Sequence, residues 1–376
     1  MILSWRSCQP ICAHTITRTA VRSIKGFEML VERVEGKWIA AFVEVFGLCK
    51  VRAGDVVAIL SETQSRPVNV QLAELALSQI GARAFHVVLP SRRLTAPVPV
   101  RSTGASDAVG GLEPVIAALA GTSLVVDCTV EGMLHAPELP RILGNGARLF
   151  MISNEHPETL ERMLPDPALE PKVKLATRML KESRQMRVTS PHGTDLVVDM
   201  TGASVGGVWG WVDRPGKVGH WPGGLCLAYP RAGAATGRVV LAPGDLNLTF
   251  KRYLESPVEL LIDQDYIVDI RGAGVDADLT RAYLEAWNDR NAYAISHVGW
   301  GMNPRARWEG LIGYDKRDTN AVEQRAFAGN FLFSTGANEA ANRYTLGHFD
   351  LPMRNCTVEL DGFSAVKHGQ LQGELA

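Results

Sequence analysis

Apolar and polar residues follow two different patterns along this chain, and the change comes near residue 187. Before this residue, continuous apolar runs alternate with segments whose apolar side chains recur every three or four positions. Residues 56–60 form such a run, typical of a strand buried on both faces of a parallel sheet. Residues 70–80 have helical spacing and end at Gly81. This alternation predicts an α/β amino-terminal domain with a mainly parallel sheet.

The same periodicities predict the other elements of this half. We expect helices over residues 38–51, 70–80, 112–119, 139–143 and 173–182, and strands over residues 56–60, 84–89, 124–127 and 148–152. Ligands of such sheets bind beyond the carboxyl ends of the strands. Because no Gly-x-Gly-x-x-Gly motif or phosphate loop follows the first strand, a nucleotide is not predicted.

After residue 187 the chain consists mainly of short β-rich runs separated by turns. We expect strands at residues 188, 196–198, 239–241, 258–262 and 266–270, and a hairpin of 357–360 and 363–366 around Asp361-Gly362. One helix interrupts them. Asp276 is suited to cap that helix, and its apolar stripe favours core packing over a cofactor site. This half predicts a β-rich α+β carboxy-terminal domain.

A length of 376 residues agrees with two domains, which we place over residues 28–186 and 187–376. Residues 1–27 contain no acidic residue and four basic ones. We interpret them as a disordered or over-extended amino terminus, with Met29 as a candidate functional start. The alternative is an organellar targeting segment.

Composition excludes several classes of partner. The 39 basic and 40 acidic residues nearly balance, which argues against a nucleic-acid partner. No run approaches 18 apolar residues, so no membrane span is expected. The six cysteines are scattered without a Cys-x-x-Cys pair, so neither a zinc site nor a disulfide framework is indicated. A reducing cytoplasm is the simplest location.

Candidate chemistry gathers between residues 297 and 350. Residues two apart in an extended segment point to the same side, so His348 and Asp350 could share one metal ion. His297 is the leading candidate for a third ligand. Two histidines and one carboxylate hold iron in non-haem ferrous oxygenases and leave open positions on the metal. The spacing alone is also consistent with a hydrogen-bonded surface pair.

Three further residues are candidates for catalysis or substrate binding. His135 lies in a loop after a predicted strand, where catalytic groups concentrate, although an exposed or helix-capping histidine is as consistent with this position. His220, beside a tryptophan in a Pro-Gly loop, would line a pocket or simply pack. Ser334 follows an apolar run and would bind a substrate oxygen or satisfy a turn.

Several long motifs, taken together, resemble the 2,5-dihydroxypyridine 5,6-dioxygenase family. They are residues 295–301, 325–327 and 329–336, the His348-x-Asp350 segment with residues 354–356, residues 220–222, and residues 124–135. The likeness extends from Glu28 to about Asp361 and keeps the same order of motifs. The metal ligands of this family correspond to His297, His348 and Asp350, the residues chosen above on chemical grounds.

The resemblance implies an Fe(II)-dependent, extradiol-type, ring-cleaving enzyme of nicotinate and nicotine breakdown. One Fe(II) per chain would lie on His297, His348 and Asp350. Dioxygen and 2,5-dihydroxypyridine would give N-formylmaleamate, with no organic cofactor. His135 would be the base that takes the hydroxyl proton, and His220 and Ser334 would orient the ring. We also expect identical chains to assemble into a homo-oligomer.

The family is itself similar to the aminopeptidase T metallopeptidases, which combine an α/β domain with a β-rich domain that holds two metals. Their pattern has a metal-binding glutamate after a Pro-Gly, where this chain has Leu225, and a second glutamate in the region of His297. These differences favour one iron over two hydrolytic metals. The alternatives are a metal-dependent aminopeptidase of this fold and a dioxygenase for another hydroxylated ring.

Overall fold

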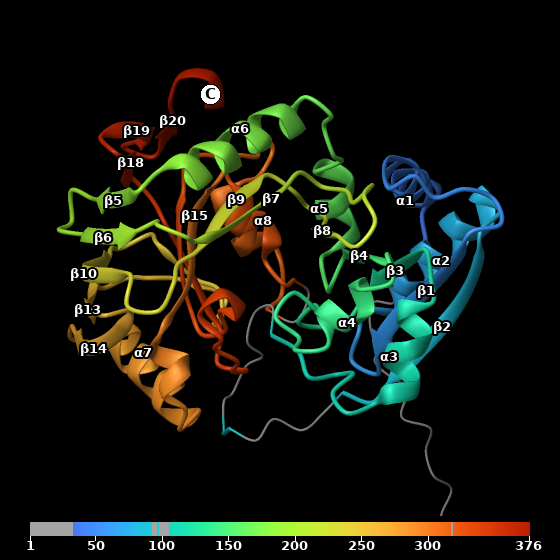
Figure 1. Cartoon of the computed structure of the whole chain (residues 1–376), viewed down its shortest axis with the longest axis horizontal. Coiled ribbons are helices and arrows are strands. Elements are labelled where there is room, and N and C mark those ends of the chain that lie inside the picture. Colours follow the sequence, from blue (N-terminus) through green and yellow to red (C-terminus); the bar gives the residue numbers. More distant parts are fainter. Residues whose placement is uncertain (1–32, 92–95, 98–104, 317–318) are drawn as a thin grey trace, which may run out of the picture. The chain divides into compact units, whose positions relative to one another are not determined.

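The computed structural model describes residues 33–91, 96–97, 105–316 and 319–376, and Val34–Ala376 forms one compact unit. The predicted amino-terminal segment 1–27 lies outside the described residues. Figure 1 shows three large sheets in the described part of the chain. In these ranges, no helix has the length and apolar character needed to cross a membrane.

The first sheet is parallel throughout, as predicted, in the order β2-β1-β3-β4-β8. Its strands are β1 (Val56–Glu62), β2 (Arg83–Leu89), β3 (Leu124–Asp127), β4 (Arg148–Met151) and β8 (Val218–His220), and its helices include α1 (Gly36–Leu48), α2 (Pro67–Ile80), α3 (Glu113–Ala120) and α4 (Leu139–Leu143). Val57 and Ile59 share a core with α1 and α2, whereas Ala58 and Leu60 share one with α3 and α4. Successive side chains of β1 are therefore buried on opposite faces, which explains its continuous apolar run.

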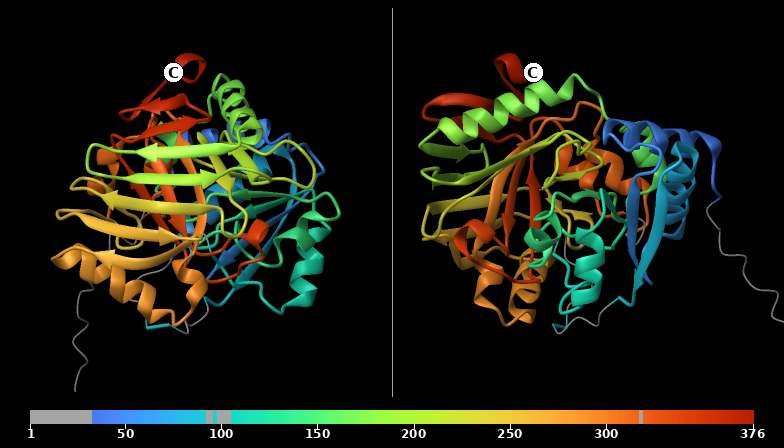
Figure 2. Two further views of the ribbon diagram at one scale, coloured as in Figure 1. Left: turned by 60° about the vertical axis from the view of Figure 1, so that its left-hand side comes forward. Right: turned by 45° about the vertical axis from the view of Figure 1, so that its right-hand side comes forward.

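The second sheet has eight antiparallel strands in the order β14-β13-β10-β6-β5-β18-β19-β20 (Figure 2). Their bounds are β5 (Gln185–Thr189), β6 (Asp195–Asp199), β10 (Ala235–Leu241), β13 (Val258–Asp263), β14 (Tyr266–Arg271), β18 (Thr357–Leu360), β19 (Phe363–Lys367) and β20 (Gln370–Leu371). Asp361 and Gly362 have φ values of 50° and 88°. Two successive positive φ angles are those of a tight hairpin turn, so the predicted hairpin is confirmed.

The third sheet carries the predicted ligands. Its antiparallel order is β17-β16-β15-β9-β7, with β7 (Ser204–Val208), β9 (Leu225–Tyr229), β15 (Ile295–Gly301), β16 (Phe331–Thr335) and β17 (Phe349–Met353). Val298 and Phe333 share a core with the eight-stranded sheet. Because side chains alternate along a strand, Ser334 and Asp350 lie on the opposite face of the sheet.

The remaining elements join these sheets. They are α5 (Pro157–Arg162), α6 (Leu169–Glu182), α7 (Val275–Ala286), α8 (Val322–Ala326), β11 (Leu246–Asn247), β12 (Arg252–Tyr253), and the short 3-10 helices Arg290–Tyr293, Trp308–Gly313, Glu339–Ala341 and Gly373–Leu375. The predicted cap of α7 is wrong, because Gly274 is its N-cap. The Asp276 carboxylate instead accepts from the backbone N–H groups of Glu255 and Ser256, at 2.8 and 2.9 Å, and so fixes the preceding loop.

Strands β7, β8, β9 and β15 were missed by the sequence analysis, as were the short strands β11, β12 and β20. β7 reads Ser-Val-Gly-Gly-Val and has little apolar side chain to reveal it. β8 pairs with β4 and so adds residues 218–220 to the parallel sheet. The division of the chain at residue 187 stays a prediction, but strands from both sides of that position build the first sheet.

We predict that Gly299→Ala destabilises the third sheet. A Cβ at Gly299 in β15 would lie 2.0 Å from the Cys226 carbonyl oxygen, whereas one at Gly206 in β7 meets nothing within 4 Å. Gly299→Ala should therefore lower the free energy of unfolding by about 2 kcal/mol or more. Gly206→Ala, the matched control, should change it by less than about 0.5 kcal/mol. Equal urea midpoints for the two variants would contradict this packing.

Candidate metal centre and active site

A cavity lies at the carboxyl end of the parallel sheet, against the third sheet. Its volume is about 50 Å³, several times the roughly 10–15 Å³ that one water molecule needs. Five of the six predicted site residues line it: His135, His220, His297, His348 and Asp350. The structure thus brings together residues from the loop after β3, from β8, and from the β15 and β17 regions.

Asp350 lies where the predicted ligands converge. Its Oδ1 is 3.3 Å from Nε2 of His348 and 3.7 Å from Nε2 of His297. The neighbouring positions of β15, β16 and β17 bring these residues close. The β15–β16 register also shifts between Ile295 and Val298, and a bulge of this kind re-aims the side chains within it, here that of His297.

Two donors hold the Asp350 carboxylate. The hydroxyl of Ser334, which pairs with Asp350 across β16 and β17, donates to Oδ1, and Nε of Arg325 donates to Oδ2 at 2.6 Å. Burial acts to raise the pKa of the Asp350 carboxyl, but His348, Arg325 and His297 together hold it well below its usual range. Asp350 is therefore a buried anion.

His297 and His348 are buried and neutral. Burial, the largest effect, lowers the pKa of His297 well below its ordinary value and also lowers the pKa of His348. In the described part of the chain, Nδ1 of each has no hydrogen-bond partner, and Nε2 of each faces Asp350. Neutral imidazoles and an ionised carboxylate are the protonation states that metal ligands require. This donor set fits a divalent cation.

The structure adds a third imidazole to this pair. The His135 ring lies 4.5 Å from that of His348 and 5.9 Å from that of His297. One ring nitrogen from each of the three lies within 4.8 Å of the others, a group that could hold a metal ion. Nδ1 of His135 is 3.2 Å from Oε1 of Glu339. His135 is therefore placed to act as a base, as predicted, or as a further ligand.

His220 and Ser334 differ in their surroundings. Nδ1 of His220 donates to the Pro222 carbonyl oxygen at 2.6 Å, and burial lowers the pKa of His220 to about 4. His220 is thus neutral near pH 7, with Nε2 as an acceptor. Ser334 is also buried, but its hydroxyl donates to Asp350 and the residue is not part of the cavity lining.

Arg325 is a site residue that sequence reasoning missed. It is 8% exposed and lines the cavity. Its Nε holds Asp350 and its Nη1 donates to the Asn320 carbonyl oxygen at 2.9 Å, but its Nη2 has no hydrogen-bond partner among the described residues. A buried guanidinium with a free donor is suited to an anionic ligand. The signal that could have identified Arg325 was its place in one of the motifs that carry the family resemblance.

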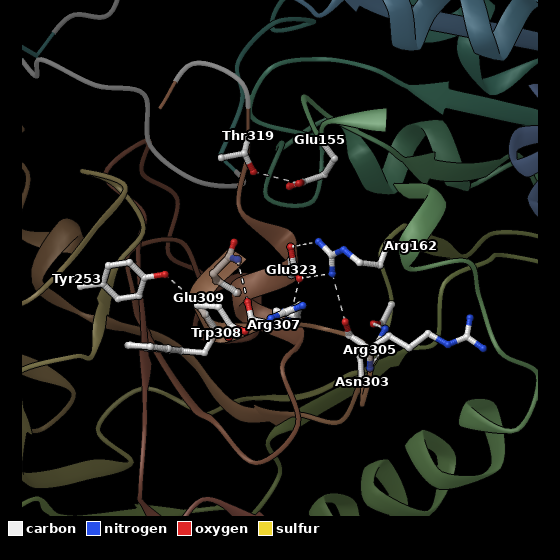
Figure 3. A network of polar contacts seen from close by, with 12 residues as sticks. Glu155, Arg162, Tyr253, Asn303, Arg305, Arg307, Trp308, Glu309, Thr319 and Glu323 are labelled. Atoms are coloured by element: carbon white, nitrogen blue, oxygen red, sulfur yellow. Dashed lines mark hydrogen bonds and ion pairs between the residues drawn. The ribbon is translucent and has the colours of Figure 1, made fainter. Parts of the chain in front are cut away.

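The helix that carries Arg325 is anchored to the parallel half (Figure 3). Arg162 of α5 donates through both terminal nitrogens to Glu323 of α8, at 2.6 and 2.9 Å. Glu155, which follows β4 and is fully buried, accepts from the backbone N–H of Val322 at 2.7 Å. Contacts from the first half of the chain therefore fix the position of Arg325, and through it that of the Asp350 carboxylate.

The fold and the buried site define a protein of the aminopeptidase T-like fold class with a candidate metal centre. The structure is similar to that of AmpT from Thermus thermophilus, with a TM-score of 0.57 and 14% sequence identity, over 90% of this chain and 99% of that one. At this identity the likeness shows the fold alone. The predicted combination of an α/β half and a β-rich half is confirmed.

Within this class, the chain belongs to the 2,5-dihydroxypyridine 5,6-dioxygenase (NicX) family, whose model matches residues 37–373. It is 35% identical over 334 residues to the 2,5-dihydroxypyridine 5,6-dioxygenase of Pseudomonas putida (strain KT2440), covering 88% of this chain and 94% of that protein. The solved structure of the dioxygenase from that strain has a TM-score of 0.85 and 34% identity, over 90% of this chain and 98% of that one. The family predicted from the motifs is confirmed.

We predict that the Arg162–Glu323 pair stabilises the fold far more than an exposed pair of similar geometry. Arg162→Met leaves the Glu323 carboxylate, 2% exposed, without its partner and should lower the free energy of unfolding by about 3 kcal/mol. Arg187→Met, the control, breaks a pair with Asp195 in which both side chains are about half exposed, and should lower the free energy of unfolding far less. Urea unfolding measures both. Similar losses would show that the Glu323 pair does not anchor α8.

Proposed function

We propose that this chain is a mononuclear non-haem Fe(II) dioxygenase that opens the ring of 2,5-dihydroxypyridine. The observation that carries the proposal is the convergence of His297, His348 and Asp350 on one cavity in a chain of this family. The C5–C6 bond breaks and both atoms of dioxygen remain in the product, N-formylmaleamate. Substrate plus dioxygen equals product in atoms and electrons, so no other oxidant or reductant is consumed.

His297, His348 and Asp350 are the proposed holders of one Fe(II) per chain. Two imidazoles and one carboxylate form the ligand set of non-haem ferrous oxygenases. One carboxylate against a divalent ion leaves a positive charge, which favours an anionic substrate oxygen. Bound ferrous iron supplies the redox chemistry that dioxygen needs to react with a closed-shell ring.

The residues of the cavity wall suit a flat ring with polar edges. Leu225, Leu227 and Leu332 contribute apolar surface to its wall, and apolar walls with few polar groups are typical of small-molecule sites. We propose that the unpaired Nη2 of Arg325 binds an anionic ring oxygen. His220, with Nε2 as an acceptor, is proposed to orient the ring.

His135 is the proposed base for the hydroxyl proton. Its Nδ1 faces the Glu339 carboxylate, which leaves Nε2 as the nitrogen able to take a proton. Within the described ranges, that Nε2 is buried and has no hydrogen-bond partner. The contact of Ser334 with the ring stays a prediction. Its hydroxyl supports a different task, since it already donates to Asp350.

The other functions that the sequence left open rank behind this proposal. A metal-dependent aminopeptidase shares the fold, but Leu225 lines the cavity where the peptidase pattern has a carboxylate. A dioxygenase for another hydroxylated ring would use the same residues. A cytoplasmic location and a homo-oligomeric state stay predictions.

Oxygen uptake tests the proposed function. Protein purified without metal and loaded anaerobically with ferrous iron should consume one dioxygen for each 2,5-dihydroxypyridine and form N-formylmaleamate. A chromogenic amino-acid amide should remain intact under the same conditions. Amide hydrolysis without oxygen uptake would establish the peptidase instead, and uptake with a different hydroxylated ring alone would correct the substrate.

We predict one iron per chain, and loss of activity when a ligand is replaced. His348→Ala and Asp350→Ala should each lower turnover by more than the roughly 10–100-fold typical of residues that only support a ligand. His86→Ala, an exposed histidine on β2, is the control and should keep full activity. Zinc should bind but give no turnover, because it has no redox chemistry. Two tightly held ions per chain, or full activity with zinc, would contradict the mononuclear iron site.

A further inference from the structure

Glu339 lies in a turn that buried contacts hold in place. It begins the 3-10 helix Glu339–Ala341, whose N-cap is Asn338. The fully buried Asn338 side chain donates to the Pro230 carbonyl oxygen at 2.9 Å and accepts from the backbone N–H of Ala341 at 3.1 Å. The turn is thus fixed to the end of β9, and it holds Glu339 beside His135, which lines the cavity.

The Glu339 carboxylate faces one nitrogen of His135. The two residues are 204 positions apart in the sequence, and Oε1 of Glu339 is 3.2 Å from Nδ1 of His135. The His135 side chain is 1% exposed and that of Glu339 is 35% exposed. An ionised carboxylate can only accept a hydrogen bond, so Nδ1 of His135 must carry the proton.

In the neutral ring of His135 the other nitrogen then has a free lone pair. This Nε2 is buried, and the structure gives it no hydrogen-bond partner in residues 33–91, 96–97, 105–316 and 319–376. The ring packs 4.5 Å from His348, 5.9 Å from His297 and 6.2 Å from Tyr229, as centroid distances. A lone pair at this place is available to a proton or another electrophile in the cavity.

We propose that Glu339 is a positioning residue that fixes His135 in the tautomer with Nδ1 protonated and Nε2 free. An imidazole in water prefers the opposite tautomer, which would place a proton on the nitrogen that has to act as a base. The carboxylate also balances the positive charge that forms when His135 accepts a proton, as in other carboxylate–histidine pairs. The inference rests on the proposed function for the role of His135, but the tautomer itself does not depend on any activity.

The tautomer is tested in metal-free protein by NMR with ¹⁵N-labelled histidine. The His135 signals are identified by their loss in His135→Ala, and the long-range ¹H–¹⁵N pattern shows which nitrogen is protonated. We expect Nδ1–H in the unmodified protein and a change to Nε2–H, or to a mixture, in Glu339→Ala. Glu161→Ala is the matched control, because the Glu161 side chain is 34% exposed and pairs with Lys37. An Nε2–H form in the unmodified protein, or no change in Glu339→Ala, would overturn the proposal.

A double-mutant cycle on kcat tests whether Glu339 acts through His135. Glu339→Ala should lower kcat about 10–100-fold with KM and bound metal little changed, and Glu339→Gln, which keeps an acceptor oxygen, should lose less. His135→Ala should lower turnover further and retain its metal. In the His135→Ala background, Glu339→Ala should have no additional effect, whereas a merely structural role would lower kcat equally in both backgrounds and overturn the proposal. Inactivity of the unmodified protein would instead refute the proposed function, and the NMR measurement would still decide the tautomer.

Discussion

The buried charge of Asp350 is the constraint on which the site depends. A carboxylate removed from water is stable only when it is paired and hydrogen-bonded. Arg325 and Ser334 supply those bonds, and Nε2 of each of the neutral His297 and His348 faces the carboxylate. Arg325 in turn lies on α8, which Glu155 and residues of α5 anchor to the parallel half. The first half of the chain therefore helps to set the charge of Asp350 in the second.

Local patterns in the sequence predicted the elements whose residues repeat regularly, and little beyond them. The apolar run at residues 56–60 was sufficient to predict a strand, and Asp361-Gly362 was sufficient to predict a hairpin turn. Near neighbours in the sequence decide the geometry of both. β7 was missed because its two glycines leave no periodicity. The His-x-Asp pair predicted two of the converging side chains, but the Glu339 contact with His135 joins residues 204 positions apart, and no local pattern encodes such a pairing.

The fold shared with AmpT does not determine which chemistry the site performs. In this chain the cavity wall includes Leu225 and Leu227, and Asp350 already accepts from Arg325. Two adjacent divalent ions need carboxylates to bridge and balance them, and the proposed ligand set contains one carboxylate, so it favours a single cation. Membership of the dioxygenase family and the composition of the wall support the same interpretation.

The location of the metal tests the account most directly. Crystals grown without oxygen in ferrous iron, with diffraction recorded above and below the iron absorption edge, would show where the ion lies. We expect one anomalous peak per chain, in contact with Nε2 of His297, Nε2 of His348 and the Asp350 carboxylate, and with Nε2 of His135 free. Two neighbouring peaks, or one peak that His135 ligates in place of Asp350, would contradict it.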